Sequence, residues 1–256
     1  MKFIHQVSKG SLYNQIYIPK EAENIFEAGD IVEVKLLKKK SFLYFSKALK
    51  NIGEFKEKLV KEIFSFLVKF SEIKQVFTVG SFLTEKVDYN DIDLLIITEK
   101  KINGIEEKVY TQLIDKFQLR FHIISFPESS FLNLQNICPL TRSMLYYFVS
   151  NKKFEISQET KIDKQHLQFL LMMPEDLLKI KANSRIFYDN IRRLVTLSNF
   201  LENKSLNPVE ISKKTSVLVG NFLCSQLRNN ELINENDIEF LRKIIKKYLN
   251  KIRKKL

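Results

Sequence analysis

Cysteine is scarce in this chain of 256 residues, which contains only Cys138 and Cys224. Two distant cysteines exclude a disulfide framework and lack the spacing of a zinc site, so we expect buried thiols in a reducing compartment. No apolar run approaches the roughly 18 residues of a membrane-spanning helix. The N-terminus lacks the apolar segment of a secretion signal. The sequence therefore predicts a cytoplasmic protein with no membrane association.

Basic residues are in excess. The hydrophobic fraction of 45% and the 21 phenylalanines predict a packed globular protein, and the formal net charge is +12. A basic excess favours polyanionic partners, such as nucleic acid, nucleotides or an anionic membrane surface. Residues 241–256 and 35–50 carry much of this charge and contain no acid. A solvated, lysine-rich surface explains these segments equally well.

The most informative stretch is residues 76–98. Residues 76–79 and 92–97 have the apolar composition of buried strands, and residues 82–87 between them fit a short helix. Asp91 and Asp93 are two residues apart, so on a strand both carboxylates point to one face, where they can bind a divalent cation. Gly80-Ser81 forms a turn whose backbone N–H groups and hydroxyl suit a phosphate.

The flanks of this stretch predict an α/β (α+β) fold. Apolar residues recur at helical spacing over residues 55–70 and 105–117, and residues 119–126 form a third strand that Pro127 ends. Residues 43–45 are expected to be extended, after a charged linker at residues 38–40. Strands separated by helices favour a mixed sheet flanked by helices.

The rest of the chain is predicted to be helical. We expect helices over residues 139–151, 158–172, 174–203, 207–229 and 237–254. Asn207-Pro208-Val209-Glu210 supplies an N-cap residue, a proline at the first helical position and a glutamate at the third, which is a strong helix start. Successive amphipathic helices with short connections form a bundle.

The first 37 residues form a separate pattern. Residues 15–18 alternate polar and apolar side chains up to Pro19, residues 20–26 fit a short helix, residues 28–30 a turn, and residues 31–36 a second strand. So small a piece buries too little apolar surface to be stable alone and needs a partner.

This N-terminal pattern resembles the AbrB-like swapped-hairpin domain of transcription regulators and antitoxins. The matching residues are Ser8-Lys9-Gly10, Ile16-Tyr17-Ile18-Pro19-Lys20 and Gly29-Asp30-Ile31-Val32. The resemblance implies an interleaved homodimer that binds DNA through basic side chains, for which Lys9 and Lys20 are the candidates. Residues 11–14 depart from the pattern, and a dimerisation module without DNA contact is an equally good interpretation.

The central stretch resembles the DNA polymerase beta-like nucleotidyltransferase superfamily, in particular its minimal stand-alone members. Gly80-Ser81, nine residues and Asp91-Ile92-Asp93 carry the resemblance, which extends over about residues 55–154. It implies that Asp91 and Asp93 are catalytic and bind Mg²⁺ or Mn²⁺, and that Gly80 and Ser81 bind the phosphates of ATP or another nucleoside triphosphate. The superfamily usually has a third carboxylate on a neighbouring strand, where this chain has Arg120 and His122 instead.

Three functions follow from these patterns. The first is a nucleotidyltransferase that moves a nucleoside monophosphate to a protein or nucleic-acid hydroxyl, in an antitoxin-like role. The second is a catalytically lapsed member that binds nucleotide or RNA. The third is an AbrB-like DNA-binding transcription regulator. The expected domains are residues 1–40 for dimerisation or DNA binding, 41–155 for nucleotidyl transfer, and 156–256 for a basic helical domain.

Overall fold

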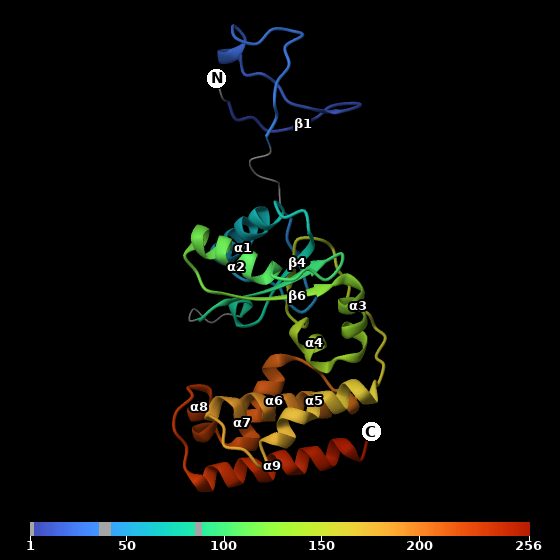
Figure 1. Ribbon diagram of the computed structural model, residues 1–256, viewed down its shortest axis with the longest axis vertical. Helices are drawn as coiled ribbons and strands as arrows, with labels where there is room; N and C mark the ends of the chain where they lie inside the picture. The colour runs from blue at the N-terminus through green and yellow to red at the C-terminus, as the bar shows by residue number, and fades with distance from the viewer. Residues whose placement is uncertain (1–2, 36–41, 85–88) are drawn as a thin grey trace. The chain divides into compact units, whose positions relative to one another are not determined.

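The computed structural model of the protein describes residues 3–35, 42–84 and 89–256. The chain divides into two compact units, residues 1–39 and residues 40–256. Strands and helices of both types occur, so the fold is mixed α/β, as the sequence predicts (Figure 1). The charged segment at residues 38–40, which we interpret as a linker, lies outside the described residues.

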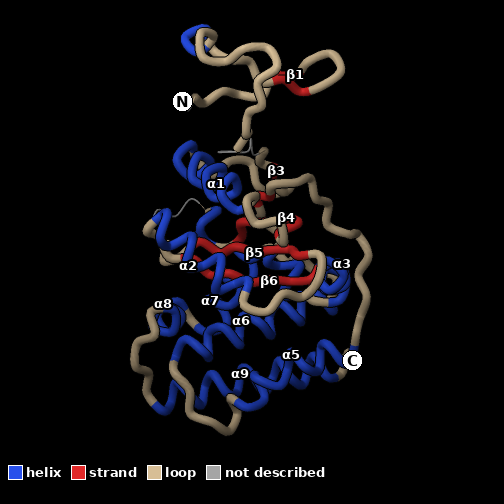
Figure 2. Tube along the Cα trace, turned by 45° about the horizontal axis from the view of Figure 1, so that its top comes forward, coloured by secondary structure: helices blue, strands red, loops and turns tan. Residues whose placement is uncertain are grey.

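A five-stranded mixed sheet lies at the centre of the larger unit. Its spatial order is β3-β7-β4-β5-β6. The strands are β3 (Tyr44–Phe45), β4 (Ile73–Val79), β5 (Ile92–Thr98), β6 (Phe121–Pro127) and β7 (Val149–Ser150). Only β5 and β6 are parallel, and every other pair is antiparallel. Figure 2 shows the long strands side by side.

One face of this sheet is covered by α1 (Glu54–Leu67) and α2 (Ile105–Phe117). Both helices present apolar residues at helical spacing, and Phe64 and Val109 are fully buried. They pack on the strand residues that point to this face, among them Val76 and Leu94. The predicted helices at residues 55–70 and 105–117 are therefore confirmed, the first with slightly different ends.

The opposite face carries a cluster of aromatic rings. Phe77 of β4 lies 5.4 Å from both Phe131 and Phe148 and 4.9 Å from Phe154, measured between ring centroids. These rings close the second face of the sheet together with Val79 and Leu95. Buried aromatic pairs of this geometry stabilise a fold beyond their apolar area.

Two helices on this second face differ from the sequence prediction. Residues 128–137, for which we predicted no element, form α3 (Glu128–Ile137). The helix predicted over residues 139–151 ends early, as α4 (Pro139–Met144), because Val149 and Ser150 instead pair with β4 and β3. Sheet pairing prevails here over the apolar pattern, which fits a buried helix and a buried strand equally well.

The C-terminal part is a helical bundle around its own apolar core. It contains α5 (Lys164–Asp176), α6 (Ser184–Leu201), α7 (Pro208–Val219), α8 (Asn221–Arg228) and α9 (Glu235–Arg253). The central helix is α6, which contacts the other four. It also contacts α4, and the Ser143 hydroxyl donates a hydrogen bond to the Leu206 carbonyl at 2.9 Å, so the bundle is joined to the sheet.

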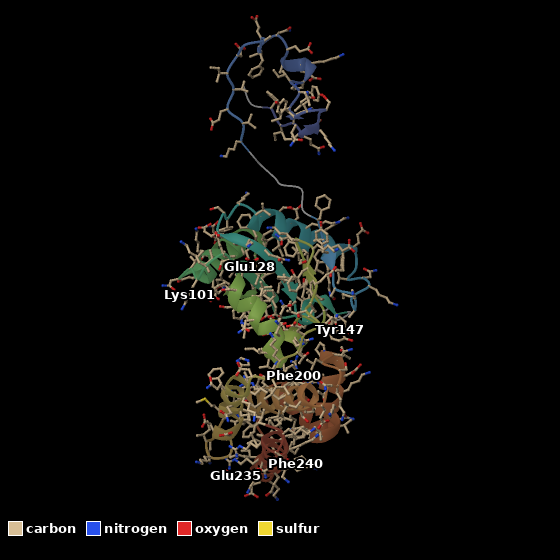
Figure 3. All side chains as sticks on the ribbon, turned by 90° about the vertical axis from the view of Figure 1, so that its right-hand side faces the viewer. Lys101, Glu128, Tyr147, Phe200, Glu235 and Phe240 are labelled. Atoms are coloured by element: carbon tan, nitrogen blue, oxygen red, sulfur yellow. The ribbon has the colours of Figure 1, made fainter. Side chains whose placement is uncertain are left out.

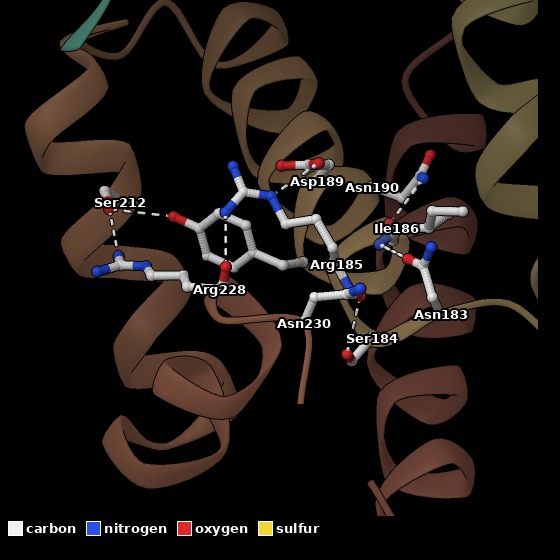
Figure 4. Close-up of polar contacts among 10 residues, drawn as sticks. Asn183, Ser184, Arg185, Ile186, Asp189, Asn190, Ser212, Arg228 and Asn230 are labelled. Atoms are coloured by element: carbon white, nitrogen blue, oxygen red, sulfur yellow. Dashed lines mark hydrogen bonds and ion pairs between the residues drawn. The ribbon is translucent and has the colours of Figure 1, made fainter. Parts of the chain in front are cut away.

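Polar contacts tie α6, α7 and α8 together (Figure 4). The Arg228 guanidinium donates to the Ser212 hydroxyl at 2.5 Å, and that of Arg185 donates to Asp189 at 3.2 Å and to the Arg228 carbonyl at 2.9 Å. Both guanidinium groups lie over the Tyr188 ring. These arginines therefore connect three helices.

The bundle helices begin and end at different places from those predicted. The Asn207 side chain caps α7 by accepting from the Val209 N–H at 2.9 Å, which confirms that helix start. However, the helix predicted over 207–229 breaks at Gly220, whose φ of 91° is left-handed. Pro174 lies inside α5 and does not open a new helix. The helix predicted over 237–254 is confirmed as α9.

The smaller unit has little regular structure. It contains the two-residue strands β1 (Ser8–Lys9) and β2 (Asn14–Gln15), which pair, and a short 3₁₀ helix, η1 (Lys20–Ala22). The strands predicted over 15–18 and 31–36 do not form within residues 16–18 and 31–35, because these residues have no backbone partner in a sheet. Residue 36 lies outside the described part of the chain.

The described part of the smaller unit leaves its apolar side chains exposed. Ala22 is its one buried hydrophobic residue, whereas Ile31 is fully exposed and Leu12 is 85% exposed. Large exposed apolar surfaces mark interaction sites. The unit therefore presents its apolar residues to a partner or to solvent.

Across the described residues, no helix combines the length and the apolar composition that crossing a bilayer requires.

The aromatic cluster gives a test of what holds the larger unit together. Replacing Phe77 by alanine removes a fully buried ring in contact with three others, so we expect the free energy of unfolding to fall by about 3–5 kcal/mol. Chemical denaturation measures it. Phe55→Ala is the matched control, because that ring is 70% exposed. Equal losses for the two variants would contradict the proposed cluster.

Candidate functional site

The candidate site lies at one end of the sheet, where β4 ends and β5 begins. Val79, the last residue of β4, is opposite Asp93 in the antiparallel pair. Asp93 is in turn opposite His122 in the parallel pair of β5 and β6. Sheet register therefore places residues from three strands in one row.

Because side chains alternate along a strand, the side chains of Asp93 and His122 point to the second face of the sheet. Along β5, Leu94 packs in the core under α1 and α2, whereas Leu95 packs in the aromatic cluster on the other side. Asp93 has the parity of Leu95, and His122 likewise has the parity of Ile124. Both side chains therefore point toward the face that carries α3 and α4.

Asp93 and His122 are in direct contact. His122 Nδ1 lies 3.0 Å from Asp93 Oδ1. An ionised carboxylate only accepts hydrogen bonds, so Nδ1 carries the proton and donates it to Asp93. In the neutral imidazole, Nε2 then holds the free lone pair. His122, 59% exposed, therefore offers a basic nitrogen to the surroundings of the site.

The surroundings of the Asp93 carboxylate disfavour its ionised form. Its side chain is only 27% exposed. Burial raises its pKa above the usual value, the nearby charge of Asp91 raises it further, and the hydrogen bond from His122 opposes the rise. The site therefore carries a carboxylate whose negative charge is incompletely compensated, which a bound cation would relieve.

Gly80 packs directly against this carboxylate. Its φ of 79° is in the left-handed region, and any Cβ at this position would overlap Asp93 Oδ2 and lie 2.9 Å from Asp93 Cγ. Only glycine allows the turn after β4 to approach the carboxylate so closely. The glycine turn predicted from the sequence is thus brought against one of the two predicted carboxylates, that of Asp93.

Ser81 begins a single turn of 3₁₀ helix, η2 (Ser81–Leu83). The helix predicted over residues 82–87 ends by Thr84, which is extended, and residues 85–87 lie outside the described part of the chain. The side chain of Ser81 is exposed, while the Thr84 hydroxyl donates to the Ser81 carbonyl at 2.7 Å. The turn is therefore fixed by its own backbone and leaves the Ser81 hydroxyl accessible.

Sequence reasoning missed the lysine that holds this turn. Lys56 of α1 donates from Nζ to the Thr84 carbonyl at 2.7 Å, and its ammonium lies over the rings of Phe82 and Tyr89. Burial lowers the pKa of Lys56. The sequence signal that could have indicated this role is the position of Lys56 within the apolar pattern of residues 55–70. Lys56 connects the glycine turn to the first helix of the unit.

Arg120 and Glu128 immediately flank β6. The Arg120 carbonyl accepts a hydrogen bond from the Ile92 N–H at 3.0 Å, which aligns the starts of β5 and β6. Glu128, an acid just beyond this strand, follows β6 at the opposite end of the sheet and pairs with Lys74. Thr98 is opposite Pro127, so Glu128 lies roughly 17 Å along the strands from Asp93 and does not reach the site.

The fit of the site to a metal ion is partial. Asp91 lies close enough to Asp93 to affect its pKa, so two carboxylates share the site. Among residues 3–35, 42–84 and 89–256, no three His, Cys, Asp or Glu side chains are grouped as a metal centre. A cation held here would take its remaining ligands from water and from substrate phosphates, as Mg²⁺ commonly does.

Lys9 and Lys20, the candidate DNA-binding residues, belong to the smaller unit. Lys9 is in β1 and Lys20 begins η1, and both side chains are exposed. Both ammonium groups are therefore accessible to solvent and to a polyanion.

The environment of Asp93 gives a pH-dependent test. Because folding raises the pKa of Asp93, its ionisation opposes folding at neutral pH, and the penalty disappears below the usual pKa of 3.8. Asp93→Asn should therefore raise the melting temperature at pH 7 and leave it nearly unchanged at pH 3. Asp115→Asn, at an exposed position of α2, is the control. Destabilisation of the Asp93 variant at pH 7 would contradict this assignment.

No protein-family model matches the chain, and no curated protein matches its sequence. The functional argument therefore depends on the geometry of the site.

Proposed function

We propose that the protein is a metal-dependent nucleotidyltransferase, which transfers a nucleoside monophosphate from a nucleoside triphosphate to a hydroxyl group. The observation that carries the proposal is the contact between the Gly80 turn and the Asp93 carboxylate, with His122 hydrogen-bonded to the same carboxylate. This contact supports placing a phosphate chain and a carboxylate-bound cation side by side, as nucleotidyl transfer requires.

Each residue then has a role. The Gly80-Ser81 turn holds the β- and γ-phosphates through backbone N–H groups and the accessible Ser81 hydroxyl. Asp91 and Asp93 would hold Mg²⁺ or Mn²⁺, which supplies neutralisation of the triphosphate charge when bound. The partly desolvated Asp93 charge supports this role.

The reaction has one bond-forming and one bond-breaking event. The acceptor oxygen attacks the α-phosphorus, the bond from this phosphorus to the oxygen bridging to the β-phosphate breaks, and pyrophosphate leaves. The acceptor hydroxyl must lose its proton. His122 Nε2 is the candidate base, because the hydrogen bond from Nδ1 to Asp93 fixes the ring with Nε2 as the lone-pair nitrogen.

One observation favours a second function. The strand beside β5 places His122 opposite Asp93, at the position where a third carboxylate is expected. A catalytically lapsed protein that binds nucleotide or RNA through the same site is therefore the alternative. It predicts nucleotide binding without transfer.

We also propose roles for the remaining segments. Residues 1–40 would form an AbrB-like homodimer that binds DNA through Lys9 and Lys20, supported by the exposed apolar residues of this unit and by the exposure of both lysines. Residues 41–155 would carry the transfer site and residues 156–256 a substrate-positioning bundle. The two free, buried cysteines support a cytoplasmic location.

A radiolabel transfer assay distinguishes an active nucleotidyltransferase from a catalytically lapsed protein. Incubation with α-³²P-labelled nucleoside triphosphates, Mg²⁺ or Mn²⁺, and either cell RNA or protein should label an acceptor. We expect Asp91→Asn and Asp93→Asn each to reduce labelling at least a hundredfold, because each removes a carboxylate from the cation. Nucleotide binding without any label transfer by the unaltered protein would leave only the lapsed alternative.

His122 can be tested by its pH dependence. His122→Gln keeps a hydrogen-bond donor toward Asp93 but removes the base, so we expect kcat to fall about 10²–10⁴-fold with little change in KM for the nucleotide. The rise of kcat with pH that a histidine base produces should also be lost. An unchanged pH profile in this variant would exclude His122 as the base.

The smaller unit is tested by a band-shift assay on double-stranded DNA. Changing Lys9 and Lys20 to Glu should abolish the shift, because each lysine would otherwise neutralise a phosphate. Lys58→Glu with Lys61→Glu on α1 is the control, with the same change in charge. Unchanged DNA binding by the Lys9 and Lys20 variant would exclude this role.

A further inference from the structure

A pocket of about 880 Å³ lies between the sheet and the helical bundle, within the larger unit. Its walls are residues 43–48, part of α4, the loop that follows β7, and the end of α6 with the residues after it. Tyr147 and Phe200 mark this junction in Figure 3. Asp91, Asp93 and the Gly80-Ser81 turn are not among the residues that line this pocket.

The charged side chains of the pocket are mostly basic. Lys47, Arg142, Lys153 and Lys204 face one acid, Glu155. Lys153 pairs with Glu155 at 3.3 Å, but both side chains are more than 70% exposed, so this pair contributes little and can be exchanged for another anion. The pocket therefore presents a net positive charge.

Arg142 adds a cation without a carboxylate partner in the described residues. Its guanidinium donates to the carbonyls of Glu159 at 2.7 Å, Gln135 at 3.2 Å and Ser157 at 3.3 Å. These acceptors are neutral, so they orient the guanidinium while leaving its charge uncompensated. Burial lowers the pKa of Arg142. An anion in the pocket would supply the compensation that the carbonyls do not.

The positive surface continues from Lys204 to the C-terminal helix. Lys204, Lys251 and Lys255 all pair with one carboxylate, Glu202, at 2.7, 2.6 and 3.0 Å. Their hydrogen bonds hold the pKa of Glu202 far below its usual range. Burial lowers the pKa of the nearby Lys214, and the charges of Lys204 and Lys251 add to this. Four lysines thus surround one acid, which leaves an excess of positive charge next to the pocket.

Aromatic rings make up the apolar part of the pocket. Tyr44 is 38% exposed, Tyr146 and Phe154 are half-buried, and Phe148 and Phe200 lie behind them. The ring of Tyr146 is fixed edge-on against Tyr147, at 4.9 Å between centroids. Rings held in place beside lysines are the combination that binds the bases and the phosphates of a single strand.

The pocket lies on the same side of the sheet as the candidate site. Phe148 packs in the aromatic cluster of the face to which Asp93 points. Its carbonyl accepts from the Ser46 N–H at 2.9 Å, and Val149, the next residue, pairs with Thr78. Phe148 is therefore at the height of Val79 and two strands, roughly 10 Å, from Asp93. A chain leaving the pocket reaches the carboxylates within a few nucleotides.

We propose that this pocket binds a single-stranded nucleic acid segment whose end is the acceptor of the transfer. The acceptor role depends on the proposed function, whereas the binding itself does not. Lys47, Lys153 and Lys204 contact phosphates, and Tyr44 and Tyr146 stack on bases. Lys251 of α9 and Lys255, which pair with the same Glu202 as Lys204, extend the phosphate track beyond the pocket.

The combination of contacts selects this ligand over an acidic peptide. A peptide carboxylate would satisfy the lysines but would leave the rings of Tyr44 and Tyr146 without a planar partner. A nucleic acid strand alternates phosphate and base, so it uses both kinds of side chain at once.

Fluorescence anisotropy of labelled 12-residue oligo(U) and oligo(dT) tests the binding. The full chain is used without nucleoside triphosphate, and every protein carries Lys9→Glu and Lys20→Glu so that residues 1–39 do not contribute. We expect Lys47→Gln, Lys153→Gln and Lys204→Gln together to weaken binding at least tenfold. The slope of log affinity against log salt should decrease by about 2, because three phosphate contacts are lost.

The matched control has the same change in charge at exposed positions outside the pocket: Lys58→Gln, Lys61→Gln and Lys101→Gln. We expect it to bind as tightly as the background protein. A second pair of variants tests the contribution of base stacking to binding, without a change in charge. Tyr146→Leu should weaken binding about tenfold, and Tyr110→Leu, 39% exposed on α2, should have no effect.

The outcomes are distinct. If the triple variant of the pocket lysines and the control triple variant bind equally weakly, the proposed binding site is wrong. The proposal also fails if polyglutamate competes as well as unlabelled oligo(U) does at equal charge. A preference for either oligo(U) or oligo(dT) supports the proposal, because both are single strands that alternate phosphate and base. If the pocket variants lose binding but the unaltered protein labels no oligonucleotide, the pocket is supported and the proposed transfer fails.

Discussion

The candidate site depends on one close contact, between the backbone of Gly80 and the carboxylate of Asp93. The antiparallel register that places Val79 opposite Asp93 brings the end of β4 to the start of β5, and the absence of a side chain at residue 80 lets the turn close against the carboxylate. A phosphate-binding turn and a cation ligand have to be adjacent if one triphosphate is to use both. In the function proposed above, the contact between Gly80 and Asp93 would supply that adjacency.

The same contact has an energetic consequence. Asp93 is partly removed from water by the turn and by the neighbouring strands, and burial raises its pKa. His122 compensates for part of the lost hydration through its hydrogen bond to Oδ1. A site that is less stable without a cation is a common feature of functional carboxylates. The ionised Asp93 therefore opposes folding in the cation-free protein, and its proposed role in binding a cation would explain this cost.

Much of this arrangement could be predicted from the sequence. The apolar runs of β4 and β5, the helical spacing of α1 and α2, and the Gly-Ser and Asp-x-Asp pair are local signals, and the structure has these elements. The contact between His122 and Asp93 depends on register between strands 29 residues apart in sequence, which no local pattern specifies. For the same reason Val149 and Ser150 were assigned to a helix, although β4 recruits them as a strand.

The second face of the sheet links the site to the rest of the larger unit. It carries the aromatic cluster, the side chains of Asp93 and His122, and one wall of the basic pocket. We propose that Asp91, Asp93 and the Gly80-Ser81 turn together bind a cation and a triphosphate. A crystal structure with Mg²⁺ and a non-hydrolysable nucleoside triphosphate tests it most directly. We expect a cation about 2.1 Å from oxygens of both carboxylates, with phosphates against Gly80 and Ser81. A triphosphate bound elsewhere, or bound here with no cation at the carboxylates, would contradict it.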